Sequence, residues 1–412
     1  MRLPGTAARA ADGFYQTTLV EVMHGHPRGG DHPRGARARG VDWRAVELGI
    51  SVAIVEMALG VFAGNVLGIT STPWIDFLAA FDGIFLTFLA GAEVGPGLFR
   101  QHFRESVVIG GLSFALPFAA AGLFAYSIAG WDLRQSEIAG IALSTTSLAV
   151  VYAVLVETGL TNTEIGKVIM AATFVTDLGT ATALSVLFIQ PTPFLALFFV
   201  VSVVVIVAML VLQPWFFRRY GDRVIEPEIK GAFLALFLLM WTADLAKSQA
   251  VLPAFLLGLA VARVFQSHRE QQKRFRVVAF SLLTPFFFLK GGMNVSLGAL
   301  AGAVPLVAAF FVVKIAAKFV GVYPASLRWL RTHATYTTLL MSTGLTFGTI
   351  SSLYGLNAGI IDRTQFSVLI TTVILSAIVP TFLAQRFFSP PLQKLTPEQL
   401  EAVEDEEFEP AR

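Results

Sequence analysis

Apolar runs of about 20 residues recur along this chain, and no other feature of the sequence limits its fold so strongly. A helix of that length crosses the roughly 30 Å hydrocarbon layer of a bilayer, and only helices and closed barrels satisfy every backbone polar group there. The mean hydropathy is +0.68 and only 14% of the residues are charged, against about 25% in an ordinary soluble domain. The sequence therefore predicts an all-α protein that crosses the membrane many times.

Twelve hydrophobic segments follow one another from Val46 onward. Their approximate spans are 46–68, 76–97, 106–128, 136–156, 166–188, 193–214, 230–246, 249–265, 277–296, 299–322, 335–356 and 365–386. An even number of crossings places both chain ends on the same side. We expect a disordered basic arm over residues 1–44, a transmembrane domain over 45–390 and an acidic cytoplasmic tail over 391–412.

The basic residues of the loops predict how the chain is oriented. With a cytoplasmic N-terminus, thirteen Lys and Arg residues fall in inner loops, and the outer loops carry only Arg134, Lys247 and Arg363. Cytoplasmic loops carry the excess of Lys and Arg in membrane proteins. We therefore expect both termini to be cytoplasmic and the protein to lie in the cell's inner (plasma) membrane.

Asp177 lies in the middle of the apolar stretch 170–189, among four threonines that include Thr176. A carboxylate at this depth costs roughly 2.5–3.5 kcal/mol on insertion scales, and such a residue is a functional candidate by default. Hard cations prefer oxygen ligands, as the sites for Ca²⁺ and Mg²⁺ illustrate. We expect Asp177 to bind a proton or a monovalent metal cation, with Thr176 as a neutral oxygen ligand.

Two other segments carry hydroxyl and glycine residues halfway across the membrane. The fourth segment contains Ser144, Thr145, Thr146 and Ser147, and the eleventh contains Ser342, Thr343, Gly344, Thr346 and Gly348. An interrupted helix needs partners for its freed backbone groups and small residues where the chain turns. Ser and Thr also bond back to unbroken helices, and Gly eases helix packing. The two clusters at matching depth favour two interrupted helices.

The positions of the two clusters suggest an internal symmetry. Segments three to five begin inside and segments ten to twelve begin outside, and each trio has its polar cluster in second place. Inverted repeats of this kind place a substrate site near the midplane, where two broken helices meet. We expect the interrupted helices to cross there, beside Asp177, with oxygen ligands from Thr145 and Thr146.

Three lysines lie well inside predicted spans, away from the span edges. Lys314 and Lys318 are one helical turn apart in the tenth segment, and Lys290 lies in the ninth. We expect them to have structural or charge-compensating roles, although long side chains near helix ends can also extend to the interface. Other acids in or beside spans include Glu56, Asp82, Glu93 and Asp244.

At these residues the sequence resembles the Kef- and Nap-type branch of bacterial monovalent cation–proton antiporters. Residues 140–188 are similar to that family's first interrupted helix, loop and acidic helix. FLTFLAGAEV is similar to its LFLAGLE segment, VAIVEMALGVFAGN to its GELLAG helix and PFFFLKGGMNVSL to its FFVSVGM helix. The matches extend from about residue 50 to residue 388, which is the whole predicted membrane region.

The resemblance implies six core helices, over about 106–188 and 299–386, that move against a dimerisation domain formed by the remaining helices. It also implies a homodimer that exchanges Na⁺ or K⁺ for protons across the lipid bilayer. Li⁺ is a further cation to compare in a transport test. The alternatives are a sodium-coupled symporter of an organic anion, and an ion channel or ion-sensing membrane module. We expect no enzyme activity, no cofactor and no nucleic-acid partner, since the sequence offers no nucleophile–base pair and contains no cysteine.

The sequence departs from the family pattern at two sites. Many exchangers carry an Asp-Asp or Asn-Asp pair on the acidic helix, where this chain has Thr176-Asp177. The second interrupted helix often has an Arg-Gly-Glu run, where this chain has Thr343-Gly344-Leu345. A single midplane carboxylate predicts electroneutral exchange. Because Thr176 cannot pair with Lys318, we expect that lysine to bond to carbonyl groups of a broken helix or to a nearby acid.

Overall fold

The computed structural model describes residues 52–93, 101–161, 163–220, 226–267 and 269–390. The basic arm over 1–44 and the acidic tail over 391–412 lie outside this range. Within it, every regular element is a helix, as the composition predicts. Eight helical stretches are long and apolar enough to cross a membrane, and two shorter apolar helices accompany them.

Each of the twelve predicted segments contains helix. The first half of the chain forms α3 (Val52–Asn65), α4 (Pro73–Ala92), α6 (Phe103–Ser127), α7 (Leu133–Ser144), α8 (Leu148–Glu157), α9 (Glu164–Leu187) and α10 (Leu195–Tyr220). The second half forms α11 (Pro227–Leu245), α12 (Val251–Ser267), α13 (Arg269–Val278), α14 (Thr284–Met293), α15 (Leu297–Trp329), α16 (Ala334–Met341), α17 (Thr346–Asn357) and α18 (Arg363–Leu383).

Two of the predicted segments are interrupted helices. Residues 145–147 separate α7 from α8, and residues 342–345 separate α16 from α17. Both breaks fall within the hydroxyl and glycine clusters that the sequence indicates. The expectation of two interrupted helices is therefore confirmed, with breaks of three and four residues.

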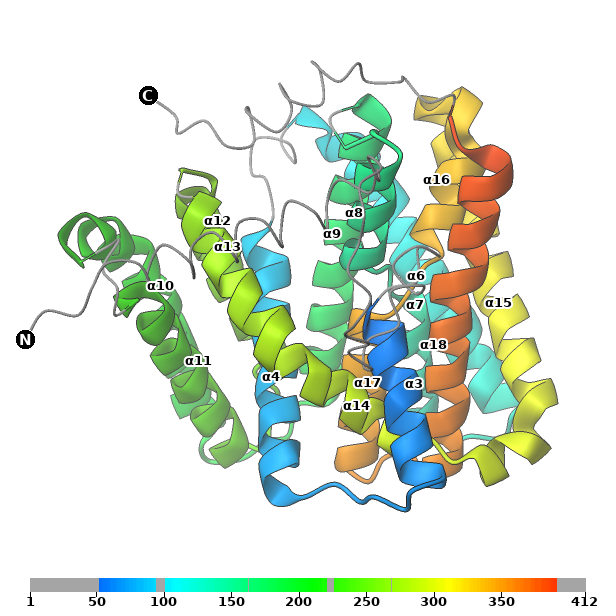
Figure 1. Ribbon diagram of the computed structural model, residues 1–412, viewed down its shortest axis with the longest axis horizontal. Helices are drawn as coiled ribbons and strands as arrows, with labels where there is room; N and C mark the ends of the chain where they lie inside the picture. Colours follow the sequence, from blue (N-terminus) through cyan, green and yellow to red (C-terminus); the bar gives the residue numbers. More distant parts are fainter. Residues whose placement is uncertain (1–51, 94–100, 162, 221–225, 268, 391–412) are drawn as a thin grey trace, which may run out of the picture. The chain divides into compact units, whose positions relative to one another are not determined.

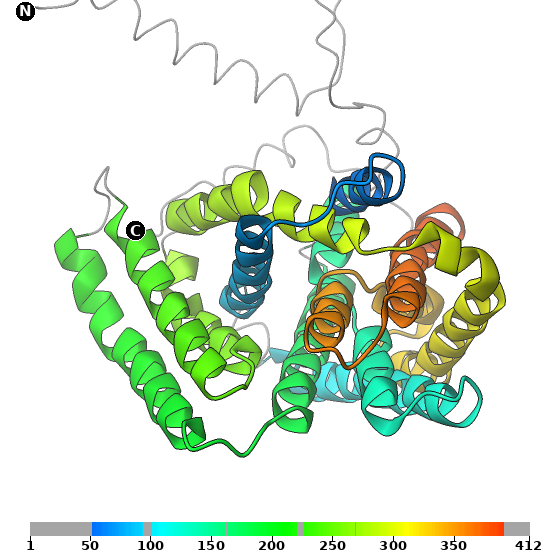
Figure 2. The same ribbon diagram turned by 90° about the horizontal axis from the view of Figure 1, so that it is seen from below.

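The two predicted repeats pack against each other. In the first repeat α6 packs on α7 and α9, and in the second α15 packs on α16 and α18. Helix α15 also packs along α6, and α17 lies against α7. Figures 1 and 2 show these helices as one group. Packing between the repeats brings together the two breaks, which are about 200 residues apart in the sequence.

The two repeats are also joined at one end through their helix caps. Asp132 and Gln135 form a capping box at the start of α7, and Asp362 and Gln365 form the same box at the start of α18. Gln365 Nε2 donates a hydrogen bond to Gln135 Oε1 at 2.9 Å. Each box satisfies backbone N–H groups that a helix start leaves free, and one hydrogen bond links the two.

The remaining helices form a second group, in which glycines allow close packing. Helices α4 and α12 contact each other at Gly91 and Gly258, where an added Cβ would collide with backbone atoms of Phe255 and Phe88. Helices α3 and α14 approach each other in the same way at Gly60 and Gly292. Small residues at such crossings let two helix backbones come within van der Waals contact.

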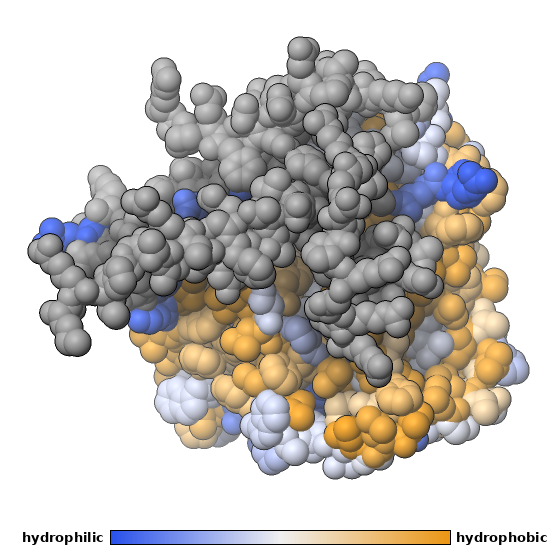
Figure 3. All heavy atoms as spheres, viewed as in Figure 1, coloured by the Kyte–Doolittle hydropathy of each residue, from blue (hydrophilic) through white to orange (hydrophobic). Residues whose placement is uncertain are grey.

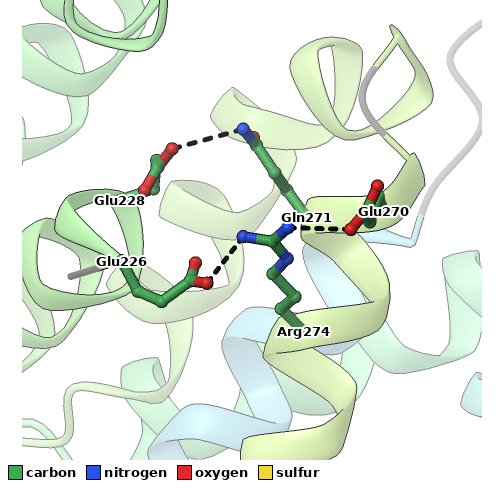
Figure 4. A network of polar contacts seen from close by, with 5 residues as sticks. All are labelled: Glu226, Glu228, Glu270, Gln271 and Arg274. Atoms are coloured by element: carbon green, nitrogen blue, oxygen red, sulfur yellow. Dashed lines mark hydrogen bonds and ion pairs between the residues drawn. The ribbon is translucent and has the colours of Figure 1, made fainter. Parts of the chain in front are cut away.

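Aromatic rings and a polar network complete this second group. Phe81, on α4, stacks on Phe237 of α11 with ring centroids 4.5 Å apart. At the start of α11, Arg274 of α13 donates hydrogen bonds to Glu226 at 2.6 Å and to Glu270 at 2.7 Å. Figure 4 shows this network, together with Gln271, which donates to Glu228 at 3.3 Å.

The outer surface of the helices is apolar. Along α10, large hydrophobic side chains are more than half exposed, among them Val200, Val203 and Val211. Hydrophobic side chains also dominate the lower part of the face in Figure 3. A surface of this kind suits hydrocarbon rather than water, and the protein is a multi-pass membrane protein.

Candidate ion-binding site

The two helix breaks lie against each other. The backbone N–H of Ser147 donates to the Thr343 carbonyl at 3.1 Å, and Thr146 Oγ1 donates to the Met341 carbonyl at 2.9 Å. A Cβ added to Gly344 would lie 2.8 Å from Thr145 Oγ1, so only glycine allows this approach. The residues that the sequence assigned to two separate breaks therefore meet at one crossing.

Four helix ends converge at this crossing. Helices α7 and α16 end at Ser144 and Met341, whereas α8 and α17 begin at Leu148 and Thr346. A helix end leaves up to four backbone groups unpaired and carries a partial charge of about half a unit, negative at the C-terminus and positive at the N-terminus. The crossing is therefore polar in surroundings that are otherwise apolar.

Most hydroxyl groups of the breaks donate back to their own helix. Thr145 Oγ1 donates to the Ala142 carbonyl at 3.2 Å, Ser342 Oγ to the Thr338 carbonyl at 2.7 Å and Thr343 Oγ1 to the Leu340 carbonyl at 2.8 Å. Ser144 Oγ does the same with Ile141. A hydroxyl that donates its proton keeps two lone pairs, so these oxygens can still act as ligands. The buried hydroxyl of Ser147 has no hydrogen-bond partner among the residues that the structure describes.

Lys318 bonds to the first break. Its ammonium group donates to the carbonyl of Ser144 and the hydroxyl of Ser113, both at 2.8 Å, and to Thr146 Oγ1 at 3.1 Å. The side chain is fully buried, so it does not extend to the membrane surface. A cation at a helix C-terminus stabilises the free carbonyl groups there.

Lys314 lies beside the second break. It is also fully buried, and its Nζ donates to Ser376 Oγ at 2.8 Å. A Cβ added to Gly344 would lie 2.5 Å from that Nζ. Each of the two lysines of α15 therefore serves one break, and the alternative that they extend to the interface is wrong for both.

Ser113 and Ser376 accept hydrogen bonds from these lysines, and neither serine was predicted as a site residue from the sequence. Each lies four residues before a proline within a helix, Pro117 in α6 and Pro380 in α18. Proline has no N–H, so the carbonyl group four residues earlier loses its helical partner. A serine at that position, in two helices of the predicted core, is the signal that could have indicated a polar site.

Asp177 lies at the centre of α9, ten residues from its end at Leu187. That distance corresponds to about 15 Å along the helix, or half of the hydrocarbon layer. The side chain is 2% exposed, and its Oδ1 has no hydrogen-bond partner in the described part of the chain. One turn earlier, Thr173 Oγ1 lies 3.6 Å from the sulfur of Met341, the last residue of α16. Asp177 is therefore a buried carboxyl group one turn from the crossing.

Thr176 is buried beside Asp177, and its hydroxyl donates to the Ala172 carbonyl at 3.0 Å. Thr180 in turn donates to the Thr176 carbonyl at 2.9 Å. Lys318 attracts and Glu93 repels the charge of Asp177. Among the described residues, Lys318 forms no ion pair with Asp177, and Glu93 is paired with Arg276. No group of three or more metal-binding side chains occurs in the part of the chain that the structure describes.

Two of the predicted site residues lie elsewhere or contribute less. Lys290 forms an ion pair with Asp76 at 2.9 Å, near the start of α4, so its charge is compensated away from the crossing. Thr346 begins α17 and is half-buried. This partner of Lys290 could not be predicted, because Asp76 is more than 200 residues away along the chain.

Glu93 takes part in a contact between the second helix group and the first broken helix. Its carboxylate accepts a hydrogen bond from Arg276 Nε at 2.9 Å, and the Arg276 guanidinium lies 5.7 Å from the ring centre of Tyr152. Arg276 belongs to α13 and Tyr152 to α8, so this contact joins the second helix group to the first broken helix.

Comparisons with known proteins agree with this geometry. Residues 41–388 match the model of the family described as "Sodium/hydrogen exchanger, transmembrane". A probable Na⁺/H⁺ antiporter of Methanocaldococcus jannaschii is 23% identical over 82% of this chain and 89% of its own length. The Na⁺/H⁺-K⁺ antiporter GerN of Bacillus cereus is 21% identical, over 85% and 91% of the two chains.

The fold is similar to that of a solved exchanger. The sodium proton antiporter MjNhaP1 of Methanocaldococcus jannaschii matches with a TM-score of 0.64 and 16% identity, over 93% of this chain and all of that one. A match at this identity shows the fold. A K⁺/H⁺ antiporter of Saccharomyces cerevisiae is 24% identical over 79% of this chain and 40% of its own length.

The inverted repeats, the crossed breaks and the buried acid define a secondary transporter of the ion-exchanging class. The chain belongs to the sodium/hydrogen exchanger family. The expectation of monovalent cation–proton exchange is confirmed at this level, and this is a family of transporters rather than enzymes. The alternatives of an organic-anion symporter and of a channel or sensor module have no support among these relatives.

Proposed function

We propose that this protein exchanges Na⁺ or K⁺ for protons at Asp177 by alternating access. The observation that carries the proposal is the position of Asp177, buried at the centre of α9 with an unpartnered carboxylate oxygen, one turn from the crossed breaks. A single uncompensated charge is costly at this depth. The carboxyl group therefore needs one positive charge, from either a proton or a metal cation.

Competition for this one carboxyl group produces exchange. A cation that binds the carboxylate displaces the proton, and a proton that binds displaces the cation. Either ligand neutralises the site, which lowers the cost of moving it past an apolar barrier. The empty site keeps its negative charge, so moving it past the barrier costs the full desolvation energy of the carboxylate and is slow. Because the occupied site moves faster than the empty one, the protein exchanges the two ions and does not leak either.

Neutral oxygen atoms around the crossing complete the cation site. The hydroxyl oxygens of Thr176, Thr145, Thr146 and Ser147 and the free carbonyl groups of the breaks are the candidates. Hard cations bind carboxylate, carbonyl and hydroxyl oxygens together. Lys318 and Lys314 hold the breaks in place, and Lys290 compensates Asp76 at a distance from the site.

The exchange is electroneutral in this proposal, with one proton for each monovalent cation. Asp177 is the acid of the site, and Thr176 stands beside it where a second acid would be needed to carry a second proton. Lys318 is held by two oxygen atoms of the first break and by the hydroxyl of Ser113 on α6 rather than by Asp177. It therefore stays with the break and is not a second proton carrier.

Three further features complete the proposal. The helices over 106–188 and 299–386 form the core that moves, and the other helices form the scaffold through which two copies make a homodimer. Both termini are cytoplasmic, and the protein lies in the cell's inner (plasma) membrane. The support for this orientation is the distribution of Lys and Arg between the loops.

Dissipation of a pH gradient in proteoliposomes tests the proposal, with Na⁺, K⁺ and Li⁺ compared. The wild-type protein should release protons when the transported cation is added, and Asp177→Asn should abolish this release. Asp244→Asn is the matched control, since Asp244 is an exposed acid near the end of α11. Wild-type rates in Asp177→Asn would rule out Asp177 as the exchange site.

A further inference from the structure

Three phenylalanine rings meet where the two helix groups touch. Phe174 lies on α9, three residues before Asp177, and Phe347 lies on α17, two residues after the second break. Phe255 lies on α12 of the second helix group, and its ring stacks on that of Phe174 with centroids 5.5 Å apart. It also meets the Phe347 ring edge to face at 6.5 Å. Phe255 therefore contacts both the helix of the buried acid and the second broken helix.

The Phe255 ring covers the face of α9 that carries the acid. Residues three apart on a helix lie on the same face, so Phe174 and Asp177 point to the same side of α9. Phe255 is completely buried, and Phe347 and Phe174 are 2% and 6% exposed. A space that is filled and lined by apolar side chains stays dry. The three rings thus form an apolar barrier one turn from the carboxyl group.

The position of Phe255 is fixed by the second helix group. A Cβ added to Gly91 of α4 would collide with the Phe255 carbonyl oxygen, and one added to Gly258 of α12 would collide with the Phe88 carbonyl oxygen. Helix backbones that approach this closely move together. Phe255 therefore moves with α4 and α12, whereas Phe174 and Phe347 move with the core helices.

A hydrogen bond accompanies the ring contact between α9 and α12. The backbone N–H of Leu252 donates to Ser185 Oγ of α9 at 3.2 Å. This N–H belongs to the first turn of α12, where the helix itself supplies no acceptor. Leu252 and Phe255 are three residues apart and share a face of α12. The same face of α12 thus meets α9 twice, and a movement of the core along α12 breaks both contacts.

We propose that Phe255 is a gate residue for the exchange site, whose ring closes the approach to Asp177 until the core helices move. The inference rests on the proposed role of Asp177 in exchange. A cation or a charged group that enters an apolar barrier loses its hydration at a large cost in free energy. An ion therefore reaches the carboxyl group only after the Phe255 ring has separated from Phe174 and Phe347. Single ring contacts are weak, so the movement of the core can break them in each cycle.

The gate has a consequence for the coupling of the two ions. While the rings are in contact, the carboxyl group holds its ion and cannot release it to water. Without the Phe255 ring, water and ions reach Asp177 before the core has moved. Ions then bind and leave without the movement that exchange requires.

A single cysteine at the site measures this access, because the chain contains no cysteine. The reporter is Asp177→Cys in the purified full-length protein in detergent, where both faces are open to reagents. The probe is aminoethyl methanethiosulfonate, a small cation that reacts with thiols. Adding Phe255→Ala to the reporter should raise the labelling rate by at least about tenfold, because the rate follows the fraction of molecules in which the site is open.

Phe265→Ala is the matched control. Phe265 lies on the same helix and is 1% exposed, but its ring contacts Phe88 of α4 and Phe275 of α13, which both belong to the second helix group. It loses the same ring from the same helix, away from the core. Added to the reporter, it should leave the labelling rate unchanged.

Two outcomes would overturn the inference. The first is an equal labelling rate with and without Phe255→Ala. The second is an equal rise with Phe265→Ala, because the packing of the helices would then be loosened in general. If Phe255→Ala fails to fold, Phe255→Leu carries the test, since it removes the ring but keeps most of the apolar volume; it should also raise the rate. Failure of the exchange proposal would appear elsewhere, as cation-driven proton release that persists in Asp177→Asn.

Discussion

Lys318 donates a hydrogen bond to the carbonyl oxygen of Ser144 at 2.8 Å, and Ser144 is the residue at which α7 stops. The positive charge of one repeat thus lies on the negative helix end of the other. Ser113 and Thr146 hold the same ammonium group. The lysine therefore acts as a cap for a helix that ends inside the membrane, where water is absent.

Lys318→Gln should lower thermal stability more than it changes ion selectivity. The amide can replace at most part of three charge-assisted hydrogen bonds, and each buried acceptor left without a partner costs about 1–3 kcal/mol. The measurement is the melting temperature of the purified protein, followed by transport with Na⁺ and K⁺. Lys230→Gln, at an exposed lysine, is the control. Unchanged melting with loss of transport would instead make Lys318 a carrier of charge.

Gly344→Ala should slow exchange by at least about tenfold, which corresponds to 1.4 kcal/mol in the barrier. The added methyl group would lie 2.5 Å from Lys314 Nζ and 2.8 Å from Thr145 Oγ1, so the two breaks must separate. Gly302→Ala is the matched control, because a Cβ there meets nothing within 4 Å. Equal rates for both variants would mean that the glycine serves packing alone. A bulky residue at Thr146 should act like Gly344→Ala.

The final pH gradient that cation–proton exchange establishes should be insensitive to membrane potential. One net charge moved through about 100 mV is worth about 2.3 kcal/mol, so an unbalanced cycle would respond clearly. Proteoliposomes are held at zero and at about −100 mV by an ion gradient that excludes the transported cation, and the final pH gradients are compared. Equal gradients support one-for-one exchange. A shift with voltage would mean that a second charge moves, with Glu56, Asp82 and Lys318 as the groups to examine.

Gly258→Ala should destabilise the second helix group. The methyl group would collide with the backbone of α4 at Phe88, and overpacking of this kind costs about 1–3 kcal/mol. The melting temperature in detergent is the measurement. Gly231→Ala is the control, since a Cβ at Gly231 in α11 meets no atom within 4 Å. If both variants melt like the wild type, the backbones of α4 and α12 are not in the contact described here.

The sequence predicted the elements that depend on local patterns. The helix breaks at residues 145–147 and 342–345 follow from hydroxyl and glycine clusters, and Asp177 is conspicuous because a buried acid is costly. What depends on packing between distant helices was not predictable. Ser113 and Ser376 have no feature of their own until two lysines of α15 face them. Lys290 had no assigned partner, because no local pattern links it to Asp76.

The hydrogen bond between Gln135 and Gln365 has a consequence for how this chain can evolve. The two repeats are in contact at their helix caps and at the crossing of the breaks, and Lys318 of one repeat caps a helix of the other. A substitution in one repeat therefore affects the other. A substitution at one glutamine should be tolerated best when its partner changes in a compatible way. Paired changes at these two positions across related sequences would be the record of that constraint.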